Sequence, residues 1–256
     1  MINTTILKKG LPLLGVLVLL SMIGLTACHK TDDDQSGDLK ISFSPKYGSE
    51  DFVTLKSFPY AGTRAIKWSK FDFYVTGIRL VSASGSLDVS DVGMIDFTST
   101  DVNNRLINLR DIPAGDYTGI EFNVGVGTDL NKKQPKDYSS SNPLSSTSHY
   151  WEAWNSYIFS KMEGVFDSLG TGTFDLGFAI HTGTDECLQR VSIAKNIKIS
   201  NGASSEMGLD LDIKNVYAPG GSFFDLKSSP LNHNPTNIEV LKLFSTRLAA
   251  AIQLKN

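Results

Sequence analysis

Hydrophobic and polar residues alternate with a period of two along most of the chain, which is the pattern of half-buried β-strands. The alternation is clearest at 39–43, 71–81, 94–97, 117–126, 174–180, 191–199 and 207–213. Gly, Pro, Asn and Asp residues separate these segments, and no repeat of constant period is visible. The pattern predicts a mainly β protein, an antiparallel β-sandwich.

Two segments have the period of an amphipathic helix instead, and we expect two helices added to the sandwich. In the first, at 149–163, one stripe of a helix would carry Trp151, Trp154, Ile158 and Met162. In the second, at 237–254, residues 236–239 (TNIE) form a capping-box pattern at the start. The polar loop at 131–148 precedes the first helix, and a loop of this length in a compact domain is often functional.

The N-terminal residues have the pattern of a lipoprotein signal peptide. Lys8 and Lys9 precede the apolar run 11–25, which is too short to span a membrane. The run ends in Leu-Thr-Ala-Cys, which resembles a lipobox, so we expect cleavage after residue 27 and lipidation of Cys28. Residues 28–38 are polar and acidic, and we expect a disordered tether. The acidic run resembles a surface-export signal, although a plain spacer explains it nearly as well. These features predict an outer-membrane lipoprotein, on the periplasmic side or at the cell surface.

Composition narrows the possible functions. Removal of Lys8 and Lys9 leaves 22 basic against 27 acidic residues in the mature chain, a net charge near −5. Without a basic stripe, we expect no nucleic-acid partner. Lipidation of Cys28 leaves Cys187 as the remaining cysteine, which excludes an internal disulfide and a Cys-x-x-Cys site.

Candidate chemistry lies in the histidines rather than in a catalytic motif. The sequence has no nucleophile elbow, Walker loop, zinc-protease motif or dinucleotide fingerprint. His149, His181 and His233 each stand at the end of a predicted element, where they could meet at one rim of the sandwich. Imidazole is a good ligand for copper, zinc and nickel, so three such groups would make a metal site, while each histidine could instead serve as a capping or hydrogen-bonding residue.

The order of several motifs resembles the MbnP-like family, named for a periplasmic copper-binding protein encoded beside methanobactin genes. The matching segments are WSKFDFYVTGIRL at 68–80, IPAGDYTGIEFNVGV at 112–126, YWEAWNSYIFSKMEG at 150–164 and FAIHTG at 178–183. The resemblance implies one exported β-sandwich domain over 39–256. It further implies copper binding, with His181 at the position of the family's histidine. In some relatives a di-haem partner of the peroxidase type oxidises a tryptophan.

The segment at 149–164 also departs from the family pattern. His149 replaces a Met, Ala153 replaces the second Trp in an ungapped alignment, and Ser156 replaces a Gly. The replacement of a thioether by an imidazole favours Cu(II) or Zn(II). We expect the aromatic residues of this segment either to screen the metal or to serve as core residues: Trp151, Trp154 and Tyr157.

The sequence therefore predicts a lipid-anchored extracytoplasmic protein that binds a metal ion, most plausibly copper. The expected ligands are His181 together with His149 or His233. A second interpretation is a surface module that binds glycan or peptide without metal, using the loop 131–148 and nearby aromatic residues. A third, an enzyme built on Cys187 and His181, is the least favoured, and we expect no enzymatic activity.

Overall fold

The computed structural model describes residues 35–255, which contain fourteen strands and three α-helices. The helices are α1 (Thr128–Asn131), α2 (Ile213–Tyr217) and α3 (Ile238–Ala250). The strands are β1 (Ser36–Tyr47), β2 (Glu50–Asp51), β3 (Phe58–Pro59), β4 (Ala65–Ser82), β5 (Gly85–Asp96), β6 (Leu106–Pro113), β7 (Gly115–Val124), β8 (Tyr150–Trp151), β9 (Ser156–Phe166), β10 (Leu176–Gly183), β11 (Gln189–Ile199), β12 (Ser204–Asp212), β13 (Leu231–Asn232) and β14 (Ile252–Leu254). In this range no helix has the length and hydrophobicity needed to cross a membrane.

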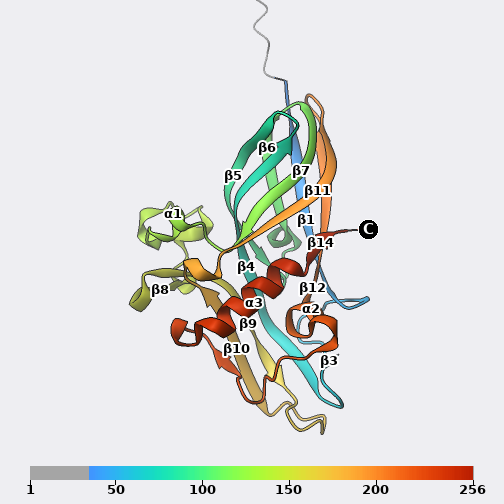
Figure 1. The fold of residues 1–256 in the computed structure, drawn as a ribbon, viewed down its shortest axis with the longest axis vertical. Coiled ribbons are helices and arrows are strands. Elements are labelled where there is room, and N and C mark those ends of the chain that lie inside the picture. The colour runs from blue at the N-terminus through green and yellow to red at the C-terminus, as the bar shows by residue number, and fades with distance from the viewer. Residues whose placement is uncertain (1–34, 256) are drawn as a thin grey trace, which may run out of the picture. The chain divides into compact units, whose positions relative to one another are not determined.

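Two sheets form the sandwich (Figure 1). The smaller has the order β14-β12-β1-β2, with β6 also paired to β1. The larger runs β11-β7-β4-β9-β10-β13, and β3, β5 and β8 pair with its members. Most pairs are antiparallel, but β1 pairs in parallel with β12, and β10 with β13. The predicted fold class, a mainly β sandwich with added helices, is confirmed.

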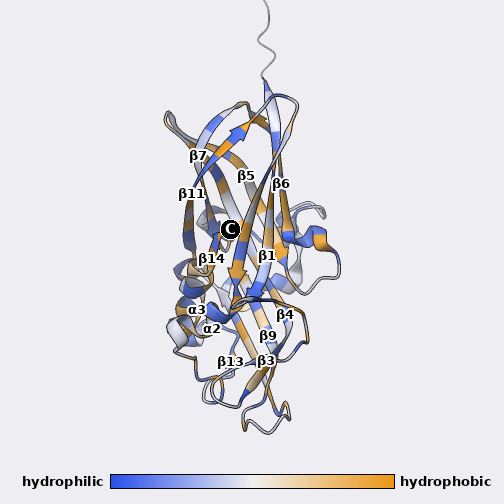
Figure 2. Ribbon diagram, turned by 90° about the vertical axis from the view of Figure 1, so that its right-hand side faces the viewer, coloured by the Kyte–Doolittle hydropathy of each residue, from blue (hydrophilic) through white to orange (hydrophobic). Residues whose placement is uncertain are grey.

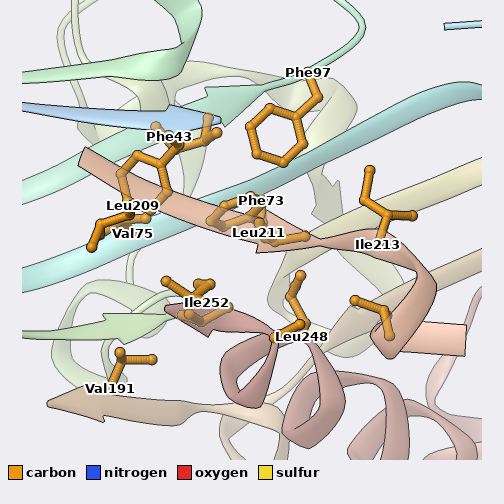
Figure 3. Packing of buried hydrophobic residues seen from close by; sticks show 14 of the residues in the cluster. Phe43, Phe73, Val75, Phe97, Val191, Leu209, Leu211, Ile213, Leu248 and Ile252 are labelled. Atoms are coloured by element: carbon orange, nitrogen blue, oxygen red, sulfur yellow. The ribbon is translucent and has the colours of Figure 1, made fainter. Parts of the chain in front are cut away.

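The core lies between the two sheets and is rich in aromatic rings. Phe43 on β1 packs edge-to-face on Phe73 of β4 and on Phe122 of β7, with ring centres 5.9 and 6.2 Å apart. Leu209 and Leu211 of β12 join the same cluster (Figure 3). Along the strands, hydrophobic and hydrophilic residues follow one another in turn (Figure 2). Burial of the hydrophobic set supplies the main driving force for pairing the sheets.

A second, smaller core covers the other face of the large sheet. In the centre of β4, residues 71–76 are all buried, because Phe71 and Phe73 face the main core while Tyr74 faces the smaller one. The segment 125–155 forms this cover. The Tyr74 hydroxyl donates to the carbonyl of Pro143 at 3.0 Å, and the Tyr157 hydroxyl donates to that of Leu144 at 2.8 Å. The cover is therefore fixed to the sheet by buried hydrogen bonds.

The predicted helix at 149–163 is wrong. Its residues form β8, a 3₁₀ turn at Glu152–Trp154 and most of β9. β9 is a central strand between β4 and β10, and residues 156–160 are buried without interruption because both faces are covered. Such a strand loses the two-residue alternation, so the spacing of its apolar residues was mistaken for a helical stripe.

The C-terminal helix is confirmed, with different ends. α3 ends at Ala250, and β14 continues the chain as the edge strand beside β12. The predicted capping box does not form; Asn234 instead caps the preceding turn by accepting from the N–H of Thr236.

At the N-terminal end of the domain, β1 begins at Ser36, so the last three residues of the predicted tether belong to the sheet. The signal peptide and residues 28–34 of the tether, with Cys28 among them, lie outside the described residues.

Candidate functional site

A row of ionisable side chains crosses the large sheet on the face turned away from the main core. On neighbouring strands of the sheet, Asp96 of β5 lies opposite Asp72 of β4, and Asp72 lies opposite Lys161 of β9. Lys161 in turn lies opposite His181 of β10. Residues directly opposite each other on neighbouring strands share a face of the sheet. The parallel pairing of Ile180 with Asn232 then brings His233, the next residue, to the end of this row.

Asp72 is the centre of the first half of the row. Its carboxylate is fully buried and accepts from Lys70 Nζ at 2.8 Å, from His149 Nε2 at 3.1 Å and from the backbone N–H of Lys161 at 3.2 Å. Lys70 also reaches Asp96 at 2.7 Å. A buried carboxylate needs such partners to stay ionised. This half of the row is therefore an ion-pair network beneath the cover.

His149 is a buried member of that network. Its Nε2 donates to Asp72, and its Nδ1 lies 3.1 Å from the Ser148 hydroxyl oxygen. The Tyr74 ring packs edge-to-face against the imidazole, with ring centres 5.7 Å apart. Both ring nitrogens thus have protein partners, and His149 ties the end of the polar loop to β4.

His181 and His233 form the second half of the row. Their ring centres lie 6.3 Å apart, and the rings meet edge to face. Nε2 of His181 lies 2.7 Å from Oε1 of Glu163 on β9. An ionised carboxylate can only accept, so Nε2 carries the ring proton and the lone pair of the neutral ring lies on Nδ1. His181 is largely buried and His233 is exposed.

Burial and charge set the protonation of this half. Burial lowers the pKa of His181 below its ordinary value of 6.5, the Glu163 carboxylate partly opposes that shift, and Lys161 and His233 add to it. Burial likewise lowers the pKa of Lys161. Lys70 behaves differently: burial lowers its pKa, but Asp72 and Asp96 outweigh this effect, and the net shift is upward. His181 is therefore a neutral imidazole at pH 7.

The structure brings together two of the three predicted histidines. His181 and His233 adjoin, whereas His149 belongs to the hydrogen-bonded group around Asp72. Within residues 35–255, no three or more His, Cys, Asp or Glu side chains are arranged to hold a metal ion. Any metal bound by the His181–His233 pair would therefore complete its coordination with water or with an added donor.

The predicted aromatic residues divide between two roles. Tyr157 is fully buried and Trp151 is 9% exposed, so both are core residues of the cover. The Trp151 ring packs on Gly183, where a side chain would overlap it. Trp154 is 45% exposed and meets Trp151 edge to face at 6.0 Å. Trp154 alone of the three is open to solvent.

Cys187 is a buried thiol of the smaller core. Burial raises its pKa above the ordinary value. A thiolate, not a thiol, is the nucleophile, and reactive cysteines have a lowered pKa. Its environment favours a packing role.

The sequence patterns did not identify three charged residues of this row: Asp72, Lys161 and Glu163. Asp72 alternates with Phe71 and Phe73 and therefore had the pattern of a solvent-facing residue. Glu163 lay in the segment mistaken for a helix. The available signal was the run of charged residues at alternate positions, Asp72 on β4 and Lys161 and Glu163 on β9, but their pairing depends on a register that no local pattern specifies.

These features define a two-sheet β-sandwich with a covered outer face and an imidazole pair at the edge of that cover. The family model of MbnP matches residues 36–237, and the chain belongs to the MbnP family. The solved structure of MbnP from Methylosinus trichosporium superposes with a TM-score of 0.51 at 14% identity, over 79% of this chain and 82% of that one. This likeness concerns the fold alone. Among curated proteins, none matches this chain.

Proposed function

We propose that this MbnP family member is an extracytoplasmic lipoprotein that binds a copper ion through His181 and His233. The observation that carries the proposal is the hydrogen bond between His181 Nε2 and Glu163, together with the 6.3 Å separation of the two imidazole rings. Membership of the family and the match of His181 to its histidine support the choice of metal.

The carboxylate–imidazole pair is the arrangement expected around a metal-binding histidine. Such a histidine usually donates one ring N–H to a carboxylate, which fixes the tautomer and raises the basicity of the other nitrogen. In His181 this leaves Nδ1 for the metal. Ligating nitrogens lie about 2.0–2.1 Å from the ion, which keeps two ring centres within about 6 Å of each other. The exposed His233 ring lies 6.3 Å from that of His181, close to this limit.

The donor set favours Cu(II) over Cu(I). The pair supplies nitrogen donors, with the Glu163 carboxylate beside them, and imidazole suits Cu(II) and Zn(II) whereas soft thioethers select Cu(I). Met162, on the neighbouring strand, is fully buried in the main core and faces away from this row. At similar geometry Cu(II) binds more tightly than Zn(II) in the Irving–Williams order, so zinc is the weaker candidate.

Isothermal titration of the detergent-solubilised lipoprotein, prepared without a histidine tag, tests this function. In a His29→Ala background, which removes the tether histidine, we expect one Cu(II) per chain. Burial lowers the pKa of His181, so this ring is in its neutral, metal-binding form at pH 7. Copper affinity should fall when acidification protonates the ligating imidazoles. An absence of binding at pH 7, or an affinity that acidification leaves unchanged, would refute the proposal.

The lipid anchor rests on the pattern that ends at Cys28. Two or three acyl chains hold a protein firmly on a membrane, whereas one chain holds it only marginally. We expect Cys28→Ser to move the protein from the outer-membrane fraction to the soluble periplasmic or secreted fraction and to abolish palmitate labelling. Unchanged membrane association of the variant would rule out this anchor.

A further inference from the structure

A cleft of about 380 Å³ opens beside the aromatic turn of the cover, at elements that the proposed metal site does not use. Its walls come from the polar loop and from the residues around the 3₁₀ turn: Gln134, Pro135, Lys136, Thr147, Tyr150, Glu152 and Asn155. The volume lies within the range of about 300–1,000 Å³ typical of small-ligand sites.

Three of the lining side chains are available to a ligand. Among residues 35–255, the side chains of Thr147, Glu152 and Asn155 make no hydrogen bond or ion pair, and all three are exposed. Together they offer a hydroxyl and an amide, which both donate and accept hydrogen bonds, and a carboxylate, which accepts them. Asn155 caps the end of the 3₁₀ turn in a left-handed backbone conformation (φ 46°), which asparagine adopts more readily than most residues.

One aromatic ring lines the cleft beside these polar groups. Tyr150 is held by an edge-to-face contact with the buried Tyr157, with ring centres 5.0 Å apart. Its ring therefore offers a ligand a fixed aromatic surface within the cleft.

Several hydrogen bonds hold the cover that carries the cleft in place. Asn131 accepts the backbone N–H of Tyr157 at 2.8 Å and donates to Asp185 at 2.9 Å, and buried tyrosine hydroxyls fix residues 143 and 144. A preformed site loses little conformational entropy when it binds a ligand. This lower cost matters most for a strongly hydrated ligand, whose contacts contribute little net affinity.

We propose that this cleft binds a neutral carbohydrate, with the sugar's C–H face stacked on Tyr150 and its hydroxyls bound by Thr147, Glu152 and Asn155. Lys136 and Glu152 balance each other in charge, so the cleft does not select a strongly charged ligand. An extended peptide is less suited, because the strand that borders the cleft, β8, is only two residues long and offers little edge for backbone pairing.

A glycan array followed by titration with the neutral oligosaccharides that it identifies, read by tryptophan fluorescence and calorimetry, tests the proposal on the full lipoprotein. Tyr150→Ala and Asn155→Gly should each weaken binding by about tenfold or more. Asn155→Gly keeps the left-handed backbone accessible, so its effect does not depend on misfolding. Leu169→Ala, a truncation of another exposed side chain, is the matched control and should bind normally.

The outcomes separate this cleft from the metal site. His181→Ala should bind the oligosaccharide as the wild type does, so failure of copper binding leaves the carbohydrate proposal standing, and the reverse also holds. No retained glycan on the array, or a retained glycan whose affinity is unchanged in both cleft variants, overturns the proposal. Selective capture of unstructured peptides from a peptide array instead of glycans also overturns it.

Discussion

The His181→Ala variant is expected to bind Cu(II) at least a hundredfold more weakly than the wild-type lipoprotein. His181 supplies one of only two imidazoles in the proposed site, and its Nδ1 is the nitrogen left available by the hydrogen bond to Glu163. A hundredfold loss corresponds to about 2.7 kcal/mol of binding free energy, which is modest for removal of one ligand from a two-imidazole site. Competition titration with a chromophoric copper chelator measures the affinity.

Two further variants test whether the loss of copper affinity is specific to the proposed ligands. His233→Ala should lose affinity to a similar degree, whereas His149→Gln should stay within about threefold of the wild type, because the Gln amide can still donate to Asp72. All of the variants are best made in a His29→Ala background, since His29 lies outside the described residues and could bind copper on its own. Strong loss in His149→Gln with normal binding in His233→Ala would contradict the assignment of the two ligands.

The Asp72→Ala variant is expected to lose about 3–5 kcal/mol of unfolding free energy. The fully buried carboxylate accepts from Lys70, from His149 and from the backbone of Lys161. Its removal leaves a buried imidazole and a buried N–H without acceptors and strips one of two carboxylates from Lys70. Urea denaturation followed by tryptophan fluorescence measures the change, at pH 7 and without copper.

A surface carboxylate supplies the control for this loss. Asp129 pairs with Lys132 but has a side chain that is 94% exposed, so Asp129→Ala should change stability by less than about 1 kcal/mol. Asp72→Asn keeps an oxygen acceptor and should fall between the two. If Asp72→Ala were as stable as Asp129→Ala, the ion-pair network would not contribute to holding the cover on the sheet.

Much of the sandwich follows from local pattern, because most strands have one buried and one wetter face. β1, for example, alternates buried and partly exposed residues along its whole length. The same rule fails where both faces of a strand are covered. In β9, continuous burial removes the alternation. The spacing of Trp151 and Trp154, which suited a helical stripe, belongs to a 3₁₀ turn that ends at Trp154. A local pattern does not contain the cover that buries the second face.

The candidate site was predictable only in part for a related reason. His181 and His233 could be chosen for their chemistry, but their proximity depends on the parallel pairing of Ile180 with Asn232, two residues that are far apart in the sequence. His149 could be chosen for the same chemistry, yet the long-range partner Asp72 places it in a different group. At the C-terminus, Ile252 suits a helix as well as a strand, and only pairing with Leu211 decides between them.

Electron spin-echo spectroscopy of the Cu(II)-loaded lipoprotein in the His29→Ala background tests the central claim most directly, because it counts the imidazoles bound to the ion. The account predicts two equatorial imidazole nitrogens, of which one disappears in His181→Ala and one in His233→Ala. A spectrum without imidazole coupling, or one that both substitutions leave unchanged, would contradict it.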